Sequence, residues 1–248
     1  MYSTTRSQLT TADYHFIAET LSHSASEQKA ILRLADDPAS VTELLHSKEL
    51  FERTMTTPPL FLPISPHLFF FVFVYQALEK RRFDDDVVDY VAAVCVELRT
   101  RDSFWHLATA EGGKMFYMVD LLKALEEADH AHEYQLRRHI GNVTLFLTGF
   151  FPDYIFRRSE SRGAPPLTYY EAIGRSQFGS AAGASASYDE GAAPVLNTLA
   201  ERFVDVRCAI NVYTDAYLSL AGRGRTLDTI RRQARTLDQE GFRDSLEL

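Results

Sequence analysis

The stretch from Pro194 to Leu220, PVLNTLAERFVDVRCAINVYTDAYLSL, carries the clearest structural signal in the chain. Its apolar side chains recur at alternating steps of three and four residues, a spacing that places them on one side of an α-helix. The residues in this apolar row are Leu196, Leu199, Phe203, Val206, Ile210, Tyr213, Tyr217 and Leu220. The pattern predicts a helix over 194–220 with one buried face, which other elements must cover.

Helical patterns extend outward from this stretch over most of the chain. We expect further helices at 11–22, 25–36, 40–54, 66–82, 84–100, 114–128, 131–150, 168–188 and 226–238. Residues 68–74 are apolar on every side, which is typical of a helix in the middle of a bundle. A β-hairpin over Trp105–Val119 is the one alternative to helix, and a loop is the better interpretation there. The sequence therefore predicts an all-α fold, a single compact bundle of about nine to eleven helices.

Domain organisation follows from the distribution of chain-breaking residues. The segment 157–166, RRSESRGAPP, is the most polar and is predicted to be an exposed loop. The helices after it still carry apolar faces that need covering, so the simplest expectation is one all-helical domain over 1–248.

Composition excludes several classes of protein. The chain has 248 residues, 46% of them hydrophobic and 24% charged, with a formal net charge of −8. This hydrophobic content is too high for a disordered chain, and the acidic balance argues against nucleic acid as a partner. The apolar run 68–78 is about half the ~20 residues that a membrane-spanning helix needs. Together with two isolated cysteines and no secretory signal, these features predict a cytoplasmic protein that does not enter a membrane.

Three segments carry a resemblance to known sequences. They are PISPHLFFFV over 63–72, HIGNVTLFLTGFFPDYIFRR over 139–158 and YYEAIGRSQFGSAA over 169–182. In these segments the chain resembles a family of uncharacterised bacterial all-helical proteins. The resemblance implies a helical bacterial fold over most of the chain, and it implies no activity and no catalytic residue.

Two Glu-x-x-His pairs are the weak candidates for a metal site. Glu127 and His130 have the spacing that ferritin-like di-iron proteins use, and Glu43 and His46 repeat it. Both pairs occur in polar surroundings, whereas a metal centre of this kind is buried in a bundle. A solvated charged surface is the favoured interpretation, and the sequence identifies no cofactor.

A polar row on the predicted helix 131–150 is the candidate ligand-binding site. His132, His139 and Asn142 recur at helical spacing and lead into apolar residues. Polar groups that enter an apolar seam must find partners, because an unpaired one costs roughly 1–3 kcal/mol. These side chains either line a pocket for a small polar ligand or bond neighbouring helices and fix their register. The second interpretation is favoured, since a buried histidine is usually satisfied by the fold.

Two further features of the sequence have structural interpretations. Small residues on the predicted helix 168–188, among them Gly179 and Gly183, favour tight packing in the core, with a second subunit or ligand along that face as the alternative. Asp205, Asn211 and Asp215 accompany the apolar row of 194–220. We expect them to form a structural ion-pair network in which Arg137, Arg138 or Arg207 is the partner.

No catalytic motif accompanies these features. The sequence lacks GxGxxG, GxxxxGK[ST], HExxH and GxSxG patterns, which disfavours several large enzyme classes, although enzymatic activity stays open. The favoured hypothesis is a cytoplasmic helical protein that acts by binding, as a scaffold, adaptor or homo-oligomer, with a protein partner or itself. The alternative is a helical-bundle enzyme or ligand carrier with a metal or small-molecule site inside the bundle.

Overall fold

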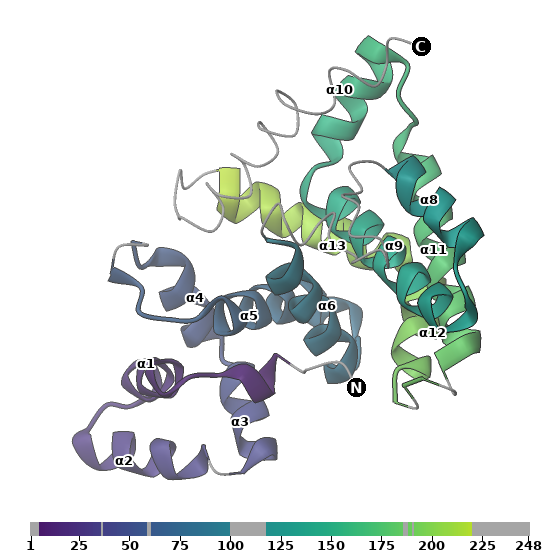
Figure 1. Ribbon diagram of the computed structural model, residues 1–248. Helices are drawn as coiled ribbons and strands as arrows, with labels where there is room; N and C mark the ends of the chain where they lie inside the picture. Colours follow the sequence, from purple (N-terminus) through teal and green to yellow (C-terminus); the bar gives the residue numbers. More distant parts are fainter. Residues whose placement is uncertain are drawn as a thin grey trace. The chain divides into compact units, whose positions relative to one another are not determined.

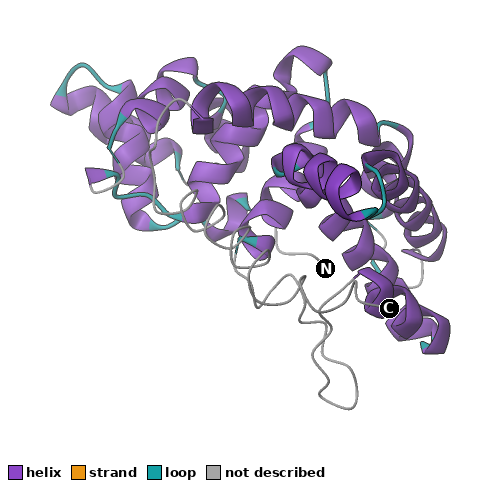
Figure 2. Ribbon diagram, turned by 90° about the horizontal axis from the view of Figure 1, so that it is seen from above, coloured by secondary structure: helices purple, strands orange, loops and turns teal. Residues whose placement is uncertain are grey.

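The computed structural model describes residues 5–35, 37–58, 61–99, 118–185, 188–189 and 191–219. Over these residues every regular element is helical and no strand occurs (Figure 2). The predicted all-α fold is confirmed. The described ranges contain twelve α-helices, slightly more than expected, because two predicted helices are each divided and one predicted loop is helical.

The described residues group into two compact units. The N-terminal unit comprises described residues between 5 and 96 together with 213–219, and the second unit comprises those between 97 and 212. The long helix predicted over 194–220 therefore contributes to both. The expectation of a single domain over 1–248 stays a prediction.

The N-terminal unit is built around a helix that is apolar on every side. It contains α1 (Thr11–Leu21), α2 (Ala25–Leu34), α3 (Pro38–Leu45), α4 (Lys48–Thr56), α5 (Pro66–Leu78) and most of α6 (Asp85–Leu98), with the 3-10 helices η1 (Arg6–Gln8) and η3 (Glu79–Arg81) (Figure 1). The Ser65 hydroxyl caps α5 by accepting a hydrogen bond from the Leu68 N–H at 3.2 Å. Phe70, Phe71 and Phe73 of α5 are fully buried, as the all-round apolar pattern predicts.

The second unit is built around two long helices that pack closely against each other. Its helices are α8 (Met118–Glu127), α9 (His130–Phe150), α10 (Pro152–Arg162), α11 (Leu167–Ala184), α12 (Ala193–Glu201) and α13 (Phe203–Tyr213, of which residue 213 belongs to the N-terminal unit) (Figure 1). α11 packs along α9 and α12. Gly141 permits this approach, because a Cβ there would lie 2.7 Å from the Phe178 ring. A buried glycine, Gly174, has the same role on α11.

The helix predicted over 194–220 is divided. α12 ends at Glu201 and α13 begins at Phe203, while Arg202 between them has the non-helical backbone angles φ −109° and ψ 24°. The apolar row continues across this break, and Leu199 and Phe203 on either side of it are both fully buried. The three- and four-residue spacing therefore gives no sign of the break. Residues 214–219 continue α13 as a π-helical turn.

The prediction of a loop over 157–166 was wrong for most of that segment. Residues 152–162 form α10, which begins with Pro152 in the first turn and ends at Gly163, whose φ of 65° is left-handed. Arginine and glutamate favour helix, and Ile155 and Arg158 supply a buried side three residues apart. Only 163–166 connect α10 to α11.

The helix predicted over 40–54 is also divided, into α3 and α4. Ser47 starts the second of these helices, since its hydroxyl accepts a hydrogen bond from the Leu50 N–H at 3.4 Å. The helix predicted over 226–238, and all of the hairpin alternative before Met118, lie outside the described residues.

Candidate functional site

The side chains predicted to form a ligand pocket lie on α9, but not in one environment. His132 stands in the first turn, where the Asp129 carboxylate accepts a hydrogen bond from its backbone N–H at 2.9 Å and lies 2.8 Å from its ring Nδ1. About half of the His132 side chain is exposed, at 53%. His139 and Asn142 lie farther along the helix, each with 5% exposure. The structure therefore groups His139 with Asn142 and separates His132 from them.

The burial predicted for His139 and Asn142 is confirmed. Their neighbours Ile140 and Val143 are fully enclosed, and the Thr144 hydroxyl donates to the Ile140 carbonyl at 2.9 Å. His139 and Asn142 each take part in an interaction within the protein. Both roles, ligand binding at this point and the fixing of helix register, stay predictions.

The residues of the two Glu-x-x-His pairs lie near the surface. Glu127 and His130 are exposed where α8 meets α9, and the His130 side chain is 98% exposed. Glu43 is exposed on α3, and the His46 side chain is 27% exposed. In the described part of the chain, no three or more histidine, cysteine, aspartate or glutamate residues are grouped so that they could hold a metal ion.

A half-buried ionic contact joins α11 to α13. Arg207 Nε donates to Glu171 Oε1 at 2.6 Å, and its Nη1 donates to Asn211 Oδ1 at 3.1 Å. The Asn211 amide in turn donates to the Thr148 carbonyl at 3.1 Å and to the Gly149 carbonyl. These carbonyls belong to the last turn of α9, where backbone acceptors lack helical partners. Asn211 and Arg207 therefore form a structural network, as expected from the sequence.

The two acidic residues expected in this network, Asp205 and Asp215, lie at different places along the stretch. Asp205 pairs with Arg202 at 3.2 Å on the same stretch, and both side chains are substantially exposed. Asp215 lies in the π-helical turn, which belongs to the N-terminal unit. The exposed Arg202–Asp205 pair contributes about 0–1 kcal/mol to the free energy of unfolding.

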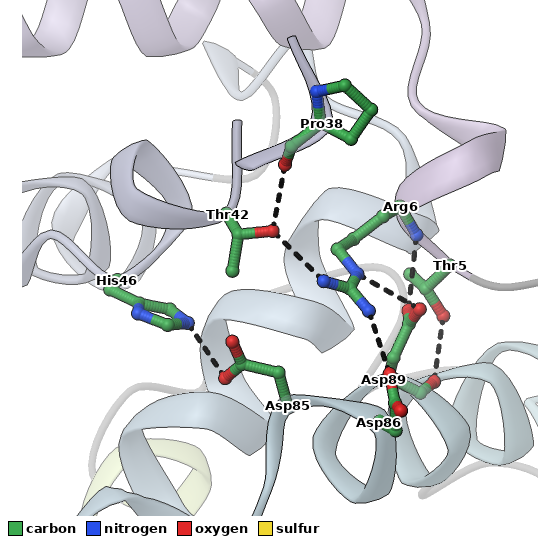
Figure 3. A network of polar contacts seen from close by, with 8 residues as sticks. All are labelled: Thr5, Arg6, Pro38, Thr42, His46, Asp85, Asp86 and Asp89. Atoms are coloured by element: carbon green, nitrogen blue, oxygen red, sulfur yellow. Dashed lines mark hydrogen bonds and ion pairs between the residues drawn. The ribbon is translucent and has the colours of Figure 1, made fainter. Parts of the chain in front are cut away.

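A second polar network, in the N-terminal unit, centres on Arg6 and Asp89 (Figure 3). Arg6 Nε donates to Asp89 Oδ2 at 3.2 Å, its Nη1 donates to the Thr42 hydroxyl at 2.9 Å, and its Nη2 donates to Asp86 Oδ1 at 3.3 Å. The Arg6 backbone N–H donates to Asp89 Oδ1 at 3.2 Å, and the Thr5 hydroxyl donates to the Asp89 carbonyl at 3.2 Å. One guanidinium thus connects η1 to α3 and α6.

Asp89 is the buried charge of this network, with no exposed side-chain surface. Burial raises the pKa of its carboxyl, and the Arg6 guanidinium opposes that rise without cancelling it. Asp89 was not among the functional residues expected from the sequence. The available signal was a carboxylate inside the apolar run VVDYVAAV, since a charge at such a position needs a partner.

Beside this network, an imidazole is held between a carboxylate and an aromatic ring. His46 Nε2 lies 3.1 Å from Asp85 Oδ1 (Figure 3). Its ring stacks on Tyr75 with centroids 3.9 Å apart. Burial, with smaller contributions from Glu79 and Asp85, raises the pKa of the Tyr75 hydroxyl. The arrangement fixes the orientation of the His46 ring, and it links α3 to α5 and α6 within the unit.

The outer face of α13 carries apolar side chains that face solvent. Val204 is 38% exposed and Val212 is 62% exposed, and the partly exposed Cys208 lies midway between them. The opposite face of α13 is buried, with Phe203 close to Gly174 and Ile210 close to Gly149. Because the three residues are spaced four apart, they form one row, which we call the α13 outer row. The buried row of this stretch was expected from the sequence, whereas the α13 outer row was not.

Comparison of the chain with protein-family models, with curated proteins and with solved structures finds no match. Across the part of the chain that the structure describes, no helix is both long enough and apolar enough to span a membrane.

Proposed function

We propose that the protein acts by binding, and that it self-associates as a symmetric dimer through the α13 outer row. The observation that carries this proposal is the exposure of Val204 and Val212 on either side of Cys208. Exposed apolar side chains that adjoin one another mark interaction sites, whereas single scattered ones are ordinary surface. Burial of the row against another chain would remove this apolar surface from water.

The spacing of the row supports a second copy of this chain as the occupant. Side chains four residues apart form a ridge, and two such ridges interdigitate when helices cross at about −50°. A two-fold axis places the same patch on both copies. The small Cys208 side chain lies at the middle of the row, so a crossing centred there lets the two helices approach closely with a valine on each side.

Sedimentation velocity over the micromolar concentration range tests the proposal. The wild-type protein is expected to pass from monomer to dimer as its concentration rises. Val212→Asp places a charge in the interface of both copies and removes two buried valines. At about 1.5 kcal/mol for each valine, the dimer dissociation constant is expected to rise about a hundredfold.

Leu34→Asp provides a matched control. Leu34 is 44% exposed, but it lies on α2 in the other unit. This substitution introduces the same charge on a partly exposed aliphatic residue and is expected to leave the dimer unchanged. A wild-type protein that stays monomeric at every concentration, or equal effects of the two substitutions, would contradict the proposal.

A further inference from the structure

The N-terminal unit surrounds the Arg6 side chain with acceptors on two helices. Each guanidinium nitrogen of Arg6 donates one hydrogen bond. The acceptors are Asp86 and Asp89 of α6 and Thr42 of α3. The Thr42 hydroxyl donates its hydrogen bond to the Pro38 carbonyl at 3.0 Å, so toward Arg6 it acts as an acceptor (Figure 3). Three acceptors therefore converge on one cation, and guanidinium, which has donors only, matches them.

The same residues also contact the backbone that carries the guanidinium. Asp89 Oδ1 accepts from the Arg6 N–H, and the Asp89 carbonyl accepts from the Thr5 hydroxyl. A free cation would make none of these contacts. The arrangement is therefore shaped for an arginine that forms part of a peptide segment.

Polar contacts, rather than apolar burial, hold η1 in place. None of the three side chains of Arg6–Gln8 is buried, whereas Asp89 beneath Arg6 is fully buried. The helices that supply the acceptors are held separately, because Val41, Leu45, Val87 and Val88 belong to the apolar core. Detachment of the N-terminal segment would therefore break the ionic contacts of Arg6 and expose the buried Thr5, while the apolar core that holds the helices stays intact.

We propose that Thr42, Asp86 and Asp89 form a binding site for an arginine within a peptide segment, that Arg6 occupies this site in cis, and that an arginine-bearing segment of a partner protein takes its place when the N-terminal segment detaches. This site lies in the N-terminal unit and does not depend on the α13 outer row. The buried Asp89 carboxylate, when ionised, favours occupancy by a cation, since an isolated buried charge is costly.

Chemical rescue of the full-length Arg6→Ala variant tests this proposal. The variant is expected to have a lower Tm than the wild type, and millimolar methylguanidinium is expected to restore several degrees of it. Methylammonium carries the same charge without the planar fork and is expected to restore less. A peptide with the sequence STTRSQ is expected to act at lower concentration than methylguanidinium, and STTKSQ is expected to be weaker. Wild-type protein, whose site is occupied, is expected to respond to none of them.

The double variant Arg6→Ala, Asp89→Asn is the matched control, because it lacks both the occupant and the charge that attracts it. It is expected to show no shift with methylguanidinium. If Arg6→Ala alone is unfolded, helix recovery in far-UV circular dichroism replaces the Tm as the readout, with the same order of ligands expected. Equal shifts with methylguanidinium and methylammonium, equal shifts in the double variant, or no response of Arg6→Ala to any ligand would each overturn the proposal.

Discussion

Replacement of Gly174 by alanine is expected to lower the free energy of unfolding by about 1–3 kcal/mol, the usual cost of overpacking a core. A Cβ at Gly174 would lie 2.6 Å from the Thr144 hydroxyl oxygen and would also meet the Phe203 ring. Neither neighbour can yield easily, because the Thr144 hydroxyl is bonded to the Ile140 carbonyl at 2.9 Å and Phe203 is fully buried. The gain of about 1 kcal/mol in helix propensity therefore does not compensate.

Gly179→Ala, on the same helix, isolates the effect of packing. A Cβ at Gly179 would meet only Ala200 Cβ at 3.7 Å, an ordinary contact. This variant is expected to be about 0.5–1 kcal/mol more stable than wild type, because alanine loses less backbone entropy than glycine. Urea unfolding followed by far-UV circular dichroism measures both variants. A Gly174→Ala protein as stable as Gly179→Ala would refute the close packing of α11 described above.

Three further substitutions test individual polar groups. Burial raises the pKa of Asp89 above its ordinary 3.8, so the native state holds that proton more tightly than the unfolded state does. The stability of wild-type protein relative to Asp89→Asn is therefore expected to fall as the pH rises from the ordinary pKa through the native one. A difference in stability between the two proteins that calorimetry finds constant with pH would contradict this. Asn211→Ala is expected to cost about 1–3 kcal/mol in urea unfolding, because it leaves two carbonyls of α9 without a partner, whereas exposed Asn197→Ala should stay within about 0.5 kcal/mol. His139→Ala is expected to abolish any thermal shift that a screened small polar compound gives the wild type, and a shift that persists in the variant would exclude binding at His139.

The predictions from sequence succeeded where a periodic pattern alone determines the outcome. The apolar run 68–74 predicted an interior helix, and Phe70, Phe71 and Phe73 are fully buried. The row around Phe203 and Ile210 likewise predicted the buried side of its helix. These outcomes follow because burial of an apolar face is the largest local contribution to folding.

Breaks in helices and tertiary partners were not predictable in the same way. The break at Arg202 leaves the apolar spacing intact, so only backbone geometry reveals it. The end of α10 carries a polar sequence that is compatible with a loop as well as with a surface helix, and the burial of Ile155 and Arg158 on one side of it depends on tertiary packing.

The partners within the polar networks were also only partly predictable from the sequence. Asn211 was expected to pair with an arginine, and Arg207 is that partner four residues away. Arg6 and Asp89 lie 83 residues apart in sequence, and no local pattern connects them. The two predicted residues that do lie together, His139 and Asn142, share one turn of α9, whereas His132 is separated from them by its place at the exposed start of the helix.

Cross-linking at Cys208 with a short bis-maleimide is the most direct test of the proposed dimer. The chain has two cysteines, and Cys95 is enclosed with a thiol whose pKa is raised by burial, so the reagent is expected to react at Cys208. A covalent dimer is expected in wild-type protein at micromolar concentration, with its loss in Cys208→Ser and its marked reduction in Val212→Asp. A wild-type protein that yields only monomer, or a Val212→Asp protein that yields as much dimer as wild type, would contradict it.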